Sequence, residues 1–366
     1  MASITVDTTA ARRKAGSTTA GIGRYALSLT EALRRMQMED RVEEFALTDE
    51  AVVARRLAWS DRRWRLAAAL SHLIPFDLER RIGSTDVFIA ADHVLPRLRH
   101  ARSVFVLYDC TYVTAPQTHA PLNRLFLRAC MPTFLRTASA VVAISESTRR
   151  DAQRIHGLAA EQVAVVYPGV GPEFTRVTEA PTLTTVRERY ALPERFVLFV
   201  GTLEPRKNLS VVLRALARPE LRDVPLVVAG RPGWLVGETE SWLDRLAVRV
   251  RRIGRVPDAD LPALYSLADV FVFPSLYEGF GLPALEAMAC GAPVIAANTS
   301  SLPEVVGDAG ILVPPDDPAQ WAGAIAGMWA SAERRDAWRA RGQSRARGFS
   351  WEAAARQFGA ICHALL

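Results

Sequence analysis

Lysine is nearly absent from this 366-residue chain, although basic residues are not. Only Lys14 and Lys207 are lysines, whereas the other 43 of the 45 basic residues are arginines. Such a preference is typical of a GC-rich genome, so most of the arginines say little about function. The formal net charge of +6 is mild and fits an anionic small molecule, a membrane surface or a nucleic acid equally well. The two lysines are therefore the basic positions to examine first.

Other absences each exclude a class of protein. The cysteines are far apart and form no C-x-x-C pair, which argues against a disulfide framework or a zinc site; they are Cys110, Cys130, Cys290 and Cys362. The opening MASITVDTTAARRKAG lacks the apolar core of a secretory signal. No apolar run approaches the roughly 18 residues that span a bilayer, and the histidines show no metal-ligand spacing. We therefore expect a cytoplasmic protein that needs neither metal nor cofactor.

Two series of alternating strand and helix patterns fill the chain. Short runs rich in Val, Ile and Phe show no polar alternation, as in DVFIA and SVFVLYD in the first half and RFVLFVG and VFVFPS in the second. Strands of this kind are covered by helices on both faces and occur in parallel sheets. We therefore predict an α/β protein made of two Rossmann-like, doubly wound parallel-sheet domains.

A segment rich in Pro, Gly and Thr, residues 168–195, separates the two series. We place the boundary near residue 180, which gives an N-terminal domain at 1–180 and a C-terminal domain at 181–348. A last helix at 349–366 is expected to pack back on the first domain. Ligands of open parallel sheets bind beyond the carboxyl ends of the strands. Two such domains facing each other would enclose a central cleft, with the chemistry at the strand ends.

A cationic pair follows the first strand of the second series. After RFVLFVG come Thr202 to Asn208 and then a helical pattern, so Arg206 and Lys207 stand at a strand end just before a helix. Arginine provides a planar fork and lysine a mobile point charge, and together they suit a phosphate group. Many surface arginine–lysine pairs are only solvated. The rarity of lysine and the position at a strand end favour an anion site here.

A glycine-containing loop follows the strand VFVFPS. Between Leu276 and Glu286, Gly279 and Gly281 let the backbone approach a ligand and present N–H groups at a helix N-terminus, where anions bind. Glu278 precedes this loop, and Glu286 lies about one turn into the helix. Because carboxylates accept hydrogen bonds from vicinal hydroxyls, the two glutamates indicate a sugar or ribose ligand. The alternative for Glu286 alone is that it complements the helix dipole.

These residues and their surroundings resemble family-4 retaining glycosyltransferases of the GT-B fold, and bacterial polysaccharide mannosyltransferases among them. The resemblance is dense over roughly residues 196–320 and includes VGTLEPRKNL, LYEGFGLPALEAMACGAPVIA and SSLPEVVGDAGILVPP. It is thinner in GIGRYALSLTEAL and VVAISESTRRD. The E-x7-E spacing from Glu278 to Glu286 is its most specific mark. The GT-B fold, two Rossmann-like domains facing a central cleft, agrees with the fold that the strand patterns predict.

For the second domain, the resemblance implies a role for each matching residue. Arg206 and Lys207 hold the donor diphosphate, and Glu278 faces the donor sugar. Backbone N–H groups of the glycine loop bind sugar and phosphate, while Glu286 takes the ribose hydroxyls and the other positions line the nucleoside pocket. The donor-binding residues implied in this way are Gly230, Arg231, Val256, Gly279, Phe280, Gly281, Leu282 and Glu286.

For the first domain, the implied positions are Gly23 and Asp109. The sequence from Gly21 to Ala26 matches the dinucleotide fingerprint G-x-G-x-x-A, but fourteen residues separate it from the first strand, which argues against NAD binding. The resemblance instead implies that this loop caps the donor phosphate through Gly23. Family members often carry His-Asp at the end of a first-domain strand, where this chain has Tyr108 and then Asp109. Asp109 stays a catalytic candidate, but an imidazole at its neighbour is missing.

The resemblance implies a metal-independent, retaining hexosyltransferase. No D-x-D pair stands at a strand end in the loops expected to face the cleft, so Arg206, Lys207 and the helix end at Gly281 would stabilise the departing diphosphate. The expected reaction moves a hexose, preferably mannose from GDP-mannose, to a hydroxyl of a glycan or lipid-linked glycan in cell-surface polysaccharide or lipopolysaccharide synthesis. UDP- and dTDP-sugar donors stay open, as does, with less support, a sugar-nucleotide epimerase of the same fold.

A basic amphipathic stretch at residues 54–81 concerns the acceptor. It contains Arg55, Arg56, Arg62, Arg63, Arg65, Arg80 and Arg81 among Trp59, Trp64, Leu66, Leu70 and Leu73. Such a stretch can lie on an anionic leaflet, which would suit a lipid-linked acceptor and peripheral contact with the inner face of the cytoplasmic membrane. A packed helix with a solvated arginine face is an equally weighted alternative. Since the other arginines are dispersed and no RNA-binding sheet motif is visible, no nucleic acid partner is expected.

Overall fold

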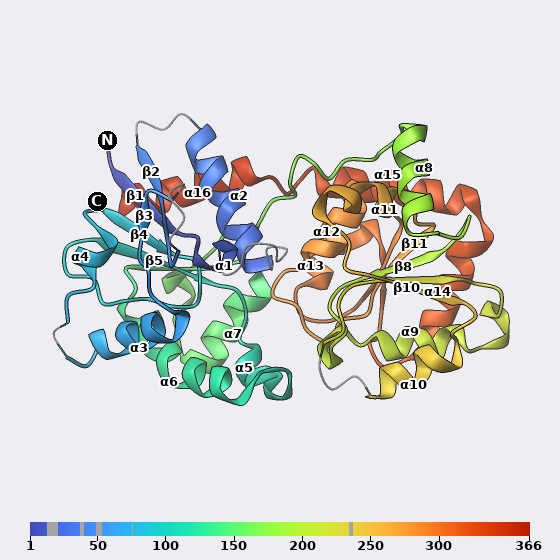
Figure 1. Cartoon of the computed structure of the whole chain (residues 1–366), viewed down its shortest axis with the longest axis horizontal. Helices are drawn as coiled ribbons and strands as arrows, with labels where there is room; N and C mark the ends of the chain where they lie inside the picture. The colour runs from blue at the N-terminus through green and yellow to red at the C-terminus, as the bar shows by residue number, and fades with distance from the viewer. Residues whose placement is uncertain (13–20, 37–39, 49–52, 75, 234–236) are drawn as a thin grey trace. The chain divides into compact units, whose positions relative to one another are not determined.

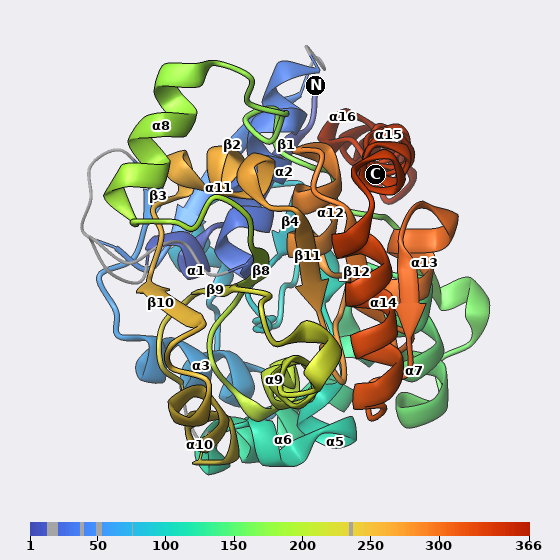
Figure 2. The same cartoon turned by 90° about the vertical axis from the view of Figure 1, so that its right-hand side faces the viewer.

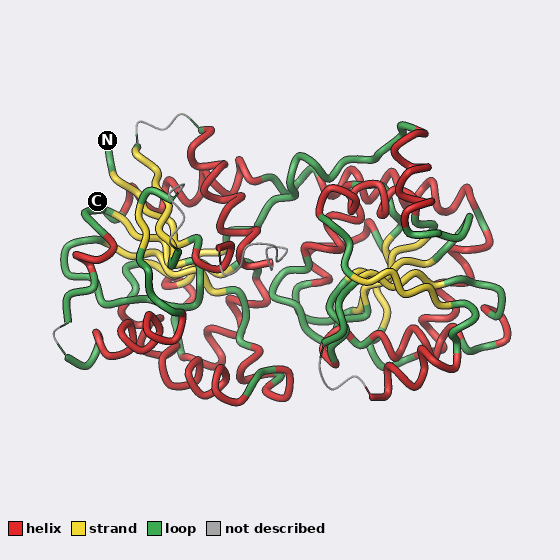
Figure 3. The backbone as a smooth tube through the Cα atoms, in the orientation of Figure 1, coloured by secondary structure: helices red, strands yellow, loops and turns green. Residues whose placement is uncertain are grey.

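The computed structural model describes residues 1–12, 21–36, 40–48, 53–74, 76–233 and 237–366; Lys14 lies outside them. The chain forms two units, one of Met1–Gly169 with Ser350–Leu366 and one of Val170–Phe349. In each unit the strands form a central sheet with helices on both faces (Figures 1 and 3). Among the described helices, none is long and apolar enough to cross a membrane.

The first unit is built on seven strands. They are β1 (Ser3–Asp7), β2 (Arg41–Ala46), β3 (Arg55–Arg56), β4 (Val87–Ala90), β5 (Arg102–Leu107), β6 (Ala140–Ala143) and β7 (Val163–Val165). Its helices are α1 (Thr9–Arg12), α2 (Gly21–Arg35), α3 (Asp61–Ser71), α4 (Glu79–Ile82), α5 (Thr111–Thr114), α6 (Pro121–Thr137), α7 (Glu146–His156) and α16 (Trp351–Ala364). The sheet order is β3-β2-β1-β4-β5-β6-β7, with every neighbouring pair parallel.

The core of the first unit lies between this sheet and its helices. All four residues of β4 are buried, because α2 and α16 cover one face of the sheet while α3 and α6 cover the other (Figure 1). On the side of α3 and α6, the Trp64 ring lies 5.2 Å from the Phe45 ring, and Phe105 lies 6.2 Å from Phe134. Burial on both faces explains why the strand sequences are continuous apolar runs.

The second unit is built on six strands. They are β8 (Val197–Val200), β9 (Leu226–Ala229), β10 (Val250–Gly254), β11 (Val270–Phe273), β12 (Val294–Ala297) and β13 (Ile311–Val313). Its helices are α8 (Ala180–Arg189), α9 (Leu209–Leu216), α10 (Gly237–Arg245), α11 (Leu261–Leu267), α12 (Leu282–Ala289), α13 (Leu302–Val306), α14 (Pro318–Ala330) and α15 (Ala332–Ala346). Helices α11 and α12 lie on the opposite face of the sheet from α9 and α10 (Figures 1 and 2).

Both sheets have the doubly wound strand order. The second sheet runs β10-β9-β8-β11-β12-β13, so its order reverses between β8 and β11, just as the first reverses between β1 and β4. All neighbouring pairs of the second sheet are also parallel. The predicted pair of Rossmann-like, doubly wound sheets is therefore confirmed. A reversal of this kind leaves a crevice at the carboxyl ends of the two central strands, where ligands bind.

The two units divide between Gly169 and Val170. The composition of the sequence places the boundary about ten residues later, near residue 180. The segment that follows Gly169 packs within the second unit, because the Phe174 ring lies 6.4 Å from the Tyr265 ring. The backbone N–H of Val177 also donates to Ser266 Oγ at 3.0 Å. Its Pro, Gly and Thr content reflects irregular backbone rather than the absence of tertiary contacts.

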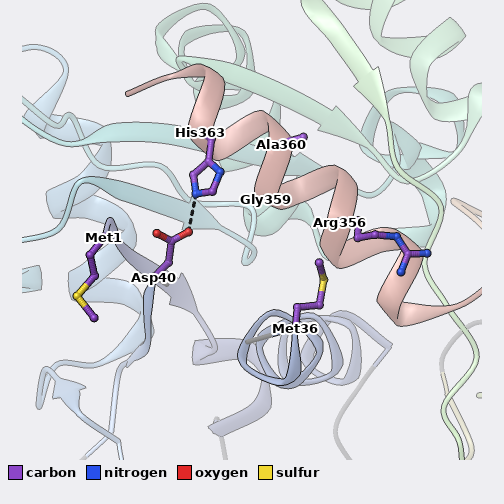
Figure 4. A pocket seen from close by; sticks show the side chains of 7 residues that line it. All are labelled: Met1, Met36, Asp40, Arg356, Gly359, Ala360 and His363. Carbon is purple, nitrogen blue, oxygen red and sulfur yellow. Dashed lines mark hydrogen bonds and ion pairs between the residues drawn. The ribbon is translucent and has the colours of Figure 1, made fainter. Parts of the chain in front are cut away.

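The C-terminal helix α16 packs on α2 of the first unit (Figure 4). Ser350 caps its N-terminus by accepting a hydrogen bond from the Ala353 N–H, and the Trp351 ring then meets the edge of Tyr25 at 5.2 Å. Near its end, His363 Nε2 lies 2.6 Å from Asp40 Oδ2. Contacts at both ends of α16 thus attach the last residues of the chain to elements that lie more than 300 residues earlier.

Candidate functional site

The strand-order reversal of the second sheet brings the two predicted motifs together. Lys207 follows β8 and Glu278 follows β11, and these two strands are hydrogen-bonded neighbours. The loops also bond directly, since the Leu276 N–H donates to the Arg206 carbonyl oxygen at 2.8 Å. Residues that are 71 positions apart in the sequence therefore share one site at the carboxyl edge of the sheet.

A buried ion pair forms the centre of this site. Lys207 Nζ lies 2.6 Å from Glu278 Oε1, and Arg206 Nη1 lies 3.0 Å from Glu278 Oε2. Burial alone raises the pKa of Glu278, but the charges of Lys207 and Arg206 outweigh it and bring the pKa to about 2. Burial lowers the pKa of Lys207, and the Glu278 carboxylate opposes part of that change. Glu278 is therefore ionised at neutral pH.

Glu204 is a fourth charged member that sequence reasoning missed. Its Oε1 lies 2.6 Å from Arg206 Nη2, and its side chain is only 7% exposed. Arg206 Nη1 also donates to the Tyr277 carbonyl oxygen at 2.9 Å, so the guanidinium is held from two sides. The four charges balance, with Arg206 and Lys207 against Glu204 and Glu278. The sequence signal that could have identified Glu204 is its position as an acidic residue two places before Arg206.

The loop after β8 holds Lys207 in place through its own sequence. Pro205 begins a single 3-10 turn that ends at Lys207, and Asn208 then adopts a left-handed φ of 52°. Asparagine tolerates this conformation better than most residues. Its amide nitrogen donates to the carbonyl oxygens of Pro274 and Pro315, which follow β11 and β13. The ammonium group of Lys207 also lies 4.9 Å from the centre of the Phe273 ring, a cation–π distance.

The glycine loop leads into α12 as predicted from its residue types. Gly281 has a φ of 111° at the N-cap, which favours glycine, and a Cβ there would also come within 2.7 Å of Leu302 Cδ2. Ser301 Oγ donates to the carbonyl oxygens of Glu278 and Phe280, at 2.9 and 2.6 Å. Ser300 Oγ accepts from the Glu278 N–H at 2.8 Å. Sequence reasoning did not assign these two serines, which fix the loop from the end of β12.

Glu286 lies in the second turn of α12 and has a different partner from Glu278. It is 4% exposed and accepts a hydrogen bond at 3.2 Å from the hydroxyl of Tyr265 on α11. The loop residues Gly279 and Phe280, and Leu282 at the start of α12, lie between the two glutamates in the chain. The two carboxylates of the E-x7-E pattern are thus held separately, one by cations and one by a tyrosine.

The remaining predicted residues of the second unit lie at the ends of β9 and β10. The Gly230 N–H donates to the Gly254 carbonyl oxygen at 2.7 Å, and a Cβ on Gly230 would lie 1.8 Å from the Gly201 carbonyl oxygen. The carbonyl oxygen of its neighbour Arg231 accepts from the N–H of Leu203. Val256 is buried just after β10. All three positions are therefore at the carboxyl edge that carries Lys207.

Gly23 and Asp109 belong to the first unit. Gly23 is buried in the first turn of α2. Asp109 follows β5 and accepts two hydrogen bonds from Thr111, whose hydroxyl in turn lies 2.7 Å from His119 Nε2. The Tyr108 hydroxyl donates to the Ala91 carbonyl oxygen, and burial raises the pKa of this phenol. The structure thus connects Asp109 through Thr111 to the imidazole of His119, a residue that the sequence pattern left unassigned.

No metal site is evident in the described part of the chain, where no group of three or more His, Cys, Asp or Glu side chains is placed to hold an ion. The sequence does contain one D-x-D pair, Asp258 and Asp260, after β10. Asp260 is occupied by other partners, since it lies 2.6 Å from Arg189 Nη1 and accepts from the Tyr190 hydroxyl.

Comparison with known proteins identifies the family. The model for glycosyl transferases group 1 matches residues 185–345, and that for glycosyltransferase family 4 matches residues 19–174. The O-antigen chain mannosyltransferase B of Escherichia coli is 32% identical over 368 residues, covering 91% of this chain and 93% of that protein. The chain belongs to family 4 of the glycosyltransferases. The resemblance read from the sequence motifs is confirmed.

Solved structures show the same GT-B architecture for this glycosyltransferase. Sucrose-phosphate synthase from Thermosynechococcus elongatus superposes with a TM-score of 0.78 at 22% identity, over 100% of this chain and 99% of that one. Anabaena HepE, solved in complex with UDP and glucose, gives a TM-score of 0.74 at 20% identity and covers 99% of each chain. At these identities the likeness concerns the fold.

Within this glycosyltransferase, the site can meet the main electrostatic demand of sugar transfer. A departing nucleoside diphosphate gains negative charge, while the anomeric carbon becomes positive. Lys207, Arg206 and the N-terminus of α12 provide fixed positive potential, and the ionised Glu278 provides a negative group beside them. Both signs of charge are in place before any ligand arrives, because buried partners already hold each side chain.

Proposed function

We propose that this glycosyltransferase moves a hexose, preferably mannose from GDP-mannose, to a hydroxyl of a glycan or lipid-linked glycan in cell-surface polysaccharide synthesis. The observation that carries the proposal is the buried Lys207–Glu278 pair with Arg206 at the strand-order reversal of the second sheet. The preference for mannose rests on the similarity to the O-antigen mannosyltransferase of Escherichia coli.

In the proposed complex, the donor diphosphate binds Lys207 and Arg206. Glu278 then faces the sugar, and the Glu286 carboxylate, held at the second turn of α12, accepts from the ribose hydroxyls. Backbone N–H groups at the start of α12 bind the anion. The further donor-binding positions in this proposal are Gly23, Gly230, Arg231, Val256, Gly279, Phe280, Gly281 and Leu282.

The reaction is proposed to retain the anomeric configuration by attack on the face from which the diphosphate departs. A bond forms between the acceptor oxygen and the anomeric carbon, the bond from that carbon to the phosphate oxygen breaks, and the departing phosphate accepts the acceptor proton. Lys207 and Arg206 stabilise the growing charge on the phosphate, so no metal is needed in this scheme. A covalent sugar trapped on Asp109 or Glu278 would instead indicate double displacement.

The test begins with the donor base. Thermal unfolding is measured with GDP, UDP and dTDP at equal concentrations, because a bound nucleotide stabilises the folded chain according to its affinity. We expect the largest shift with GDP, whereas a larger shift with UDP or dTDP would replace the proposed donor. The anomeric configuration of the product and the rate in the presence of EDTA then test retention and metal independence. Conversion of the donor sugar without an acceptor would favour an epimerase.

The enzyme is further proposed to act in the cytoplasm, in peripheral contact with the inner face of the cytoplasmic membrane. The support is the basic and apolar composition of residues 54–81. Some residues of that stretch are held within the fold of the first unit. Arg55, on the edge strand β3, is paired with Glu43, and Trp64 is fully buried.

A further inference from the structure

Exposed apolar side chains are concentrated in two segments of the first unit, residues 59–76 and 120–137. Of twelve exposed large apolar side chains in the described part of the chain, seven lie there: Leu66, Leu70, Leu73, Ile74, Phe76, Leu122 and Leu125. Leu73 is 80% exposed and Leu122 is 76% exposed. An apolar cluster of this kind on a folded surface marks a site of interaction.

The two segments are in contact through α3 and α6, and together they are here called the α3–α6 surface. Arg65 on α3 donates to Asn123 Oδ1 on α6 at 2.8 Å, and its guanidinium lies 5.3 Å from the centre of the Phe126 ring. At the other end of α3, the His72 ring lies 5.4 Å from the Phe134 ring of α6. The two helices run along the same face of the first sheet (Figure 1).

The α3–α6 surface also carries most of the chain's excess positive charge. Its two segments hold six arginines and one aspartate, a balance of +5 against +6 for all 366 residues. The single acid, Asp61, lies 2.9 Å from Arg65 Nε and is thereby neutralised. Segment 120–137 has no acidic residue. Leucines interleaved with arginines that outnumber the acids are complementary to a partner surface with anionic groups above an apolar layer.

We propose that the α3–α6 surface docks on a lipid bilayer with anionic headgroups, with the leucines entering the interface and the arginines contacting the headgroups. A bilayer is favoured over a protein partner because the surface joins exposed leucines to a net charge of +5, the combination with which amphipathic helices bind anionic lipid. The proposal rests on the proposed function, because it places the enzyme where a lipid-linked acceptor would be. It extends that function by adding α6 to the docking surface.

The test is flotation of the full chain with vesicles, without any donor. Wild type is expected to float with vesicles of equal parts phosphatidylglycerol and phosphatidylcholine and not with phosphatidylcholine alone. Leu66→Gln with Leu122→Gln should lower the partition coefficient by about tenfold or more, since each leucine contributes its transfer free energy. Replacing Arg62 and Arg63 by Gln should lower it about fivefold for each arginine.

The matched control is Val248→Gln with Arg222→Gln in the second unit, outside the α3–α6 surface, where Val248 is fully exposed and the Arg222 side chain is 81% exposed. This variant should float like wild type. Equal flotation of the leucine variant and wild type would overturn the proposal. It would also be overturned if wild type failed to float but formed a dimer that the leucine substitutions dissociate, because the surface would then bind a second copy.

A separate assay distinguishes this proposal from the proposed function. Transfer to a soluble acceptor, measured without vesicles, should be unchanged in the leucine and arginine variants because none of these residues belongs to the donor site. Activity on a soluble acceptor without vesicle binding would leave the proposed transfer reaction standing and overturn both the docking proposal and the proposed membrane contact. Vesicle binding by a chain without transferase activity would support the docking proposal and overturn the proposed transfer reaction.

Discussion

Arginine serves two different purposes in the two units. In the second unit Arg206, whose side chain is 21% exposed, lies beside the buried Lys207, and both cations are matched by Glu204 and Glu278 within 3.0 Å. On the α3–α6 surface of the first unit six arginines stand against one acid, and four of the arginines are exposed: Arg62, Arg63, Arg128 and Arg136. A buried, neutralised cluster keeps its geometry and can act on a ligand at fixed positions. An exposed surface with an excess of one charge attracts an oppositely charged partner without holding its atoms at fixed positions, and salt weakens that attraction.

The largest effect is expected under the α3–α6 surface rather than on it. Trp64→Ala should lower the free energy of unfolding by about 3–5 kcal/mol, since it empties a fully buried indole site between α3 and the sheet. Leu66→Ala, two positions along the same helix, should stay within about 0.5 kcal/mol because its side chain is exposed. Urea denaturation of both variants measures the difference. Similar losses would mean that Leu66 is part of the core.

Removing the buried cation should abolish most of the activity of the second unit. Lys207→Ala is expected to lower turnover on saturating donor at least about a hundredfold, the scale of losing one preorganised stabilising group. The control Arg222→Ala removes a cation that is 81% exposed and forms an ion pair with its neighbour Asp223, and it should leave turnover unchanged. Near wild-type turnover in Lys207→Ala would show that this side chain does not stabilise the leaving group.

Acid should weaken the buried cluster through Glu278. The pKa of Glu278 is about 2 in the folded chain and lies near its ordinary value of about 4.3 in the unfolded chain. Ionised Glu278 therefore contributes fully to the free energy of unfolding when the pH is above its ordinary pKa, and this contribution is lost as the pH falls towards 2. The free energy of unfolding of wild type should fall more steeply between pH 5 and pH 3 than that of Glu278→Gln. Parallel slopes would contradict this pairing.

The smallest effect is expected for the residue that positions Arg206. Glu204→Gln keeps a hydrogen-bond acceptor but removes a charge, so the cluster gains a net positive charge while Arg206 is held less firmly. We expect turnover to fall by about threefold to tenfold and the affinity for nucleoside diphosphate to rise. Glu220→Gln, in the exposed pair Arg218–Glu220, is the control and should change neither. A fall in affinity would overturn this role for Glu204.

Much of the site was predictable because its chemistry is local in the sequence. The strand end, the Arg206–Lys207 pair and the glycine loop each lie within a dozen residues, and their residue types alone indicate an anion and a hydroxyl-bearing ligand. Ser300 and Ser301 were not predictable in this way. They meet the loop across 22 and 23 residues, after an intervening helix and strand, and serine at a strand end has no single meaning.

The basic stretch at residues 54–81 shows the opposite limit. Its composition indicated a membrane-facing or solvated helix, but composition treats Trp64 and Leu66 alike. The sheet decides between them, because Phe45 packs against Trp64 and leaves Leu66 outside. The sequence of this stretch also does not reveal that α6 is its neighbour. Leu122 and Leu125 of α6 belong to the α3–α6 surface because α3 contacts α6 in the folded unit.

By itself, the sequence determined the kind of molecule and the kind of chemistry. Apolar strand runs require a sheet covered on both faces, and two series of them require two such sheets. The second of the chain's two lysines, beside an arginine at a strand end, indicates an anion site. Only the tertiary structure decided that this lysine is neutralised by Glu278, 71 residues away, and that the two helices carrying the exposed leucines are in contact. Charge balance and exposure depend on contacts between distant segments, which the order of strands in a sheet creates and residue spacing does not record.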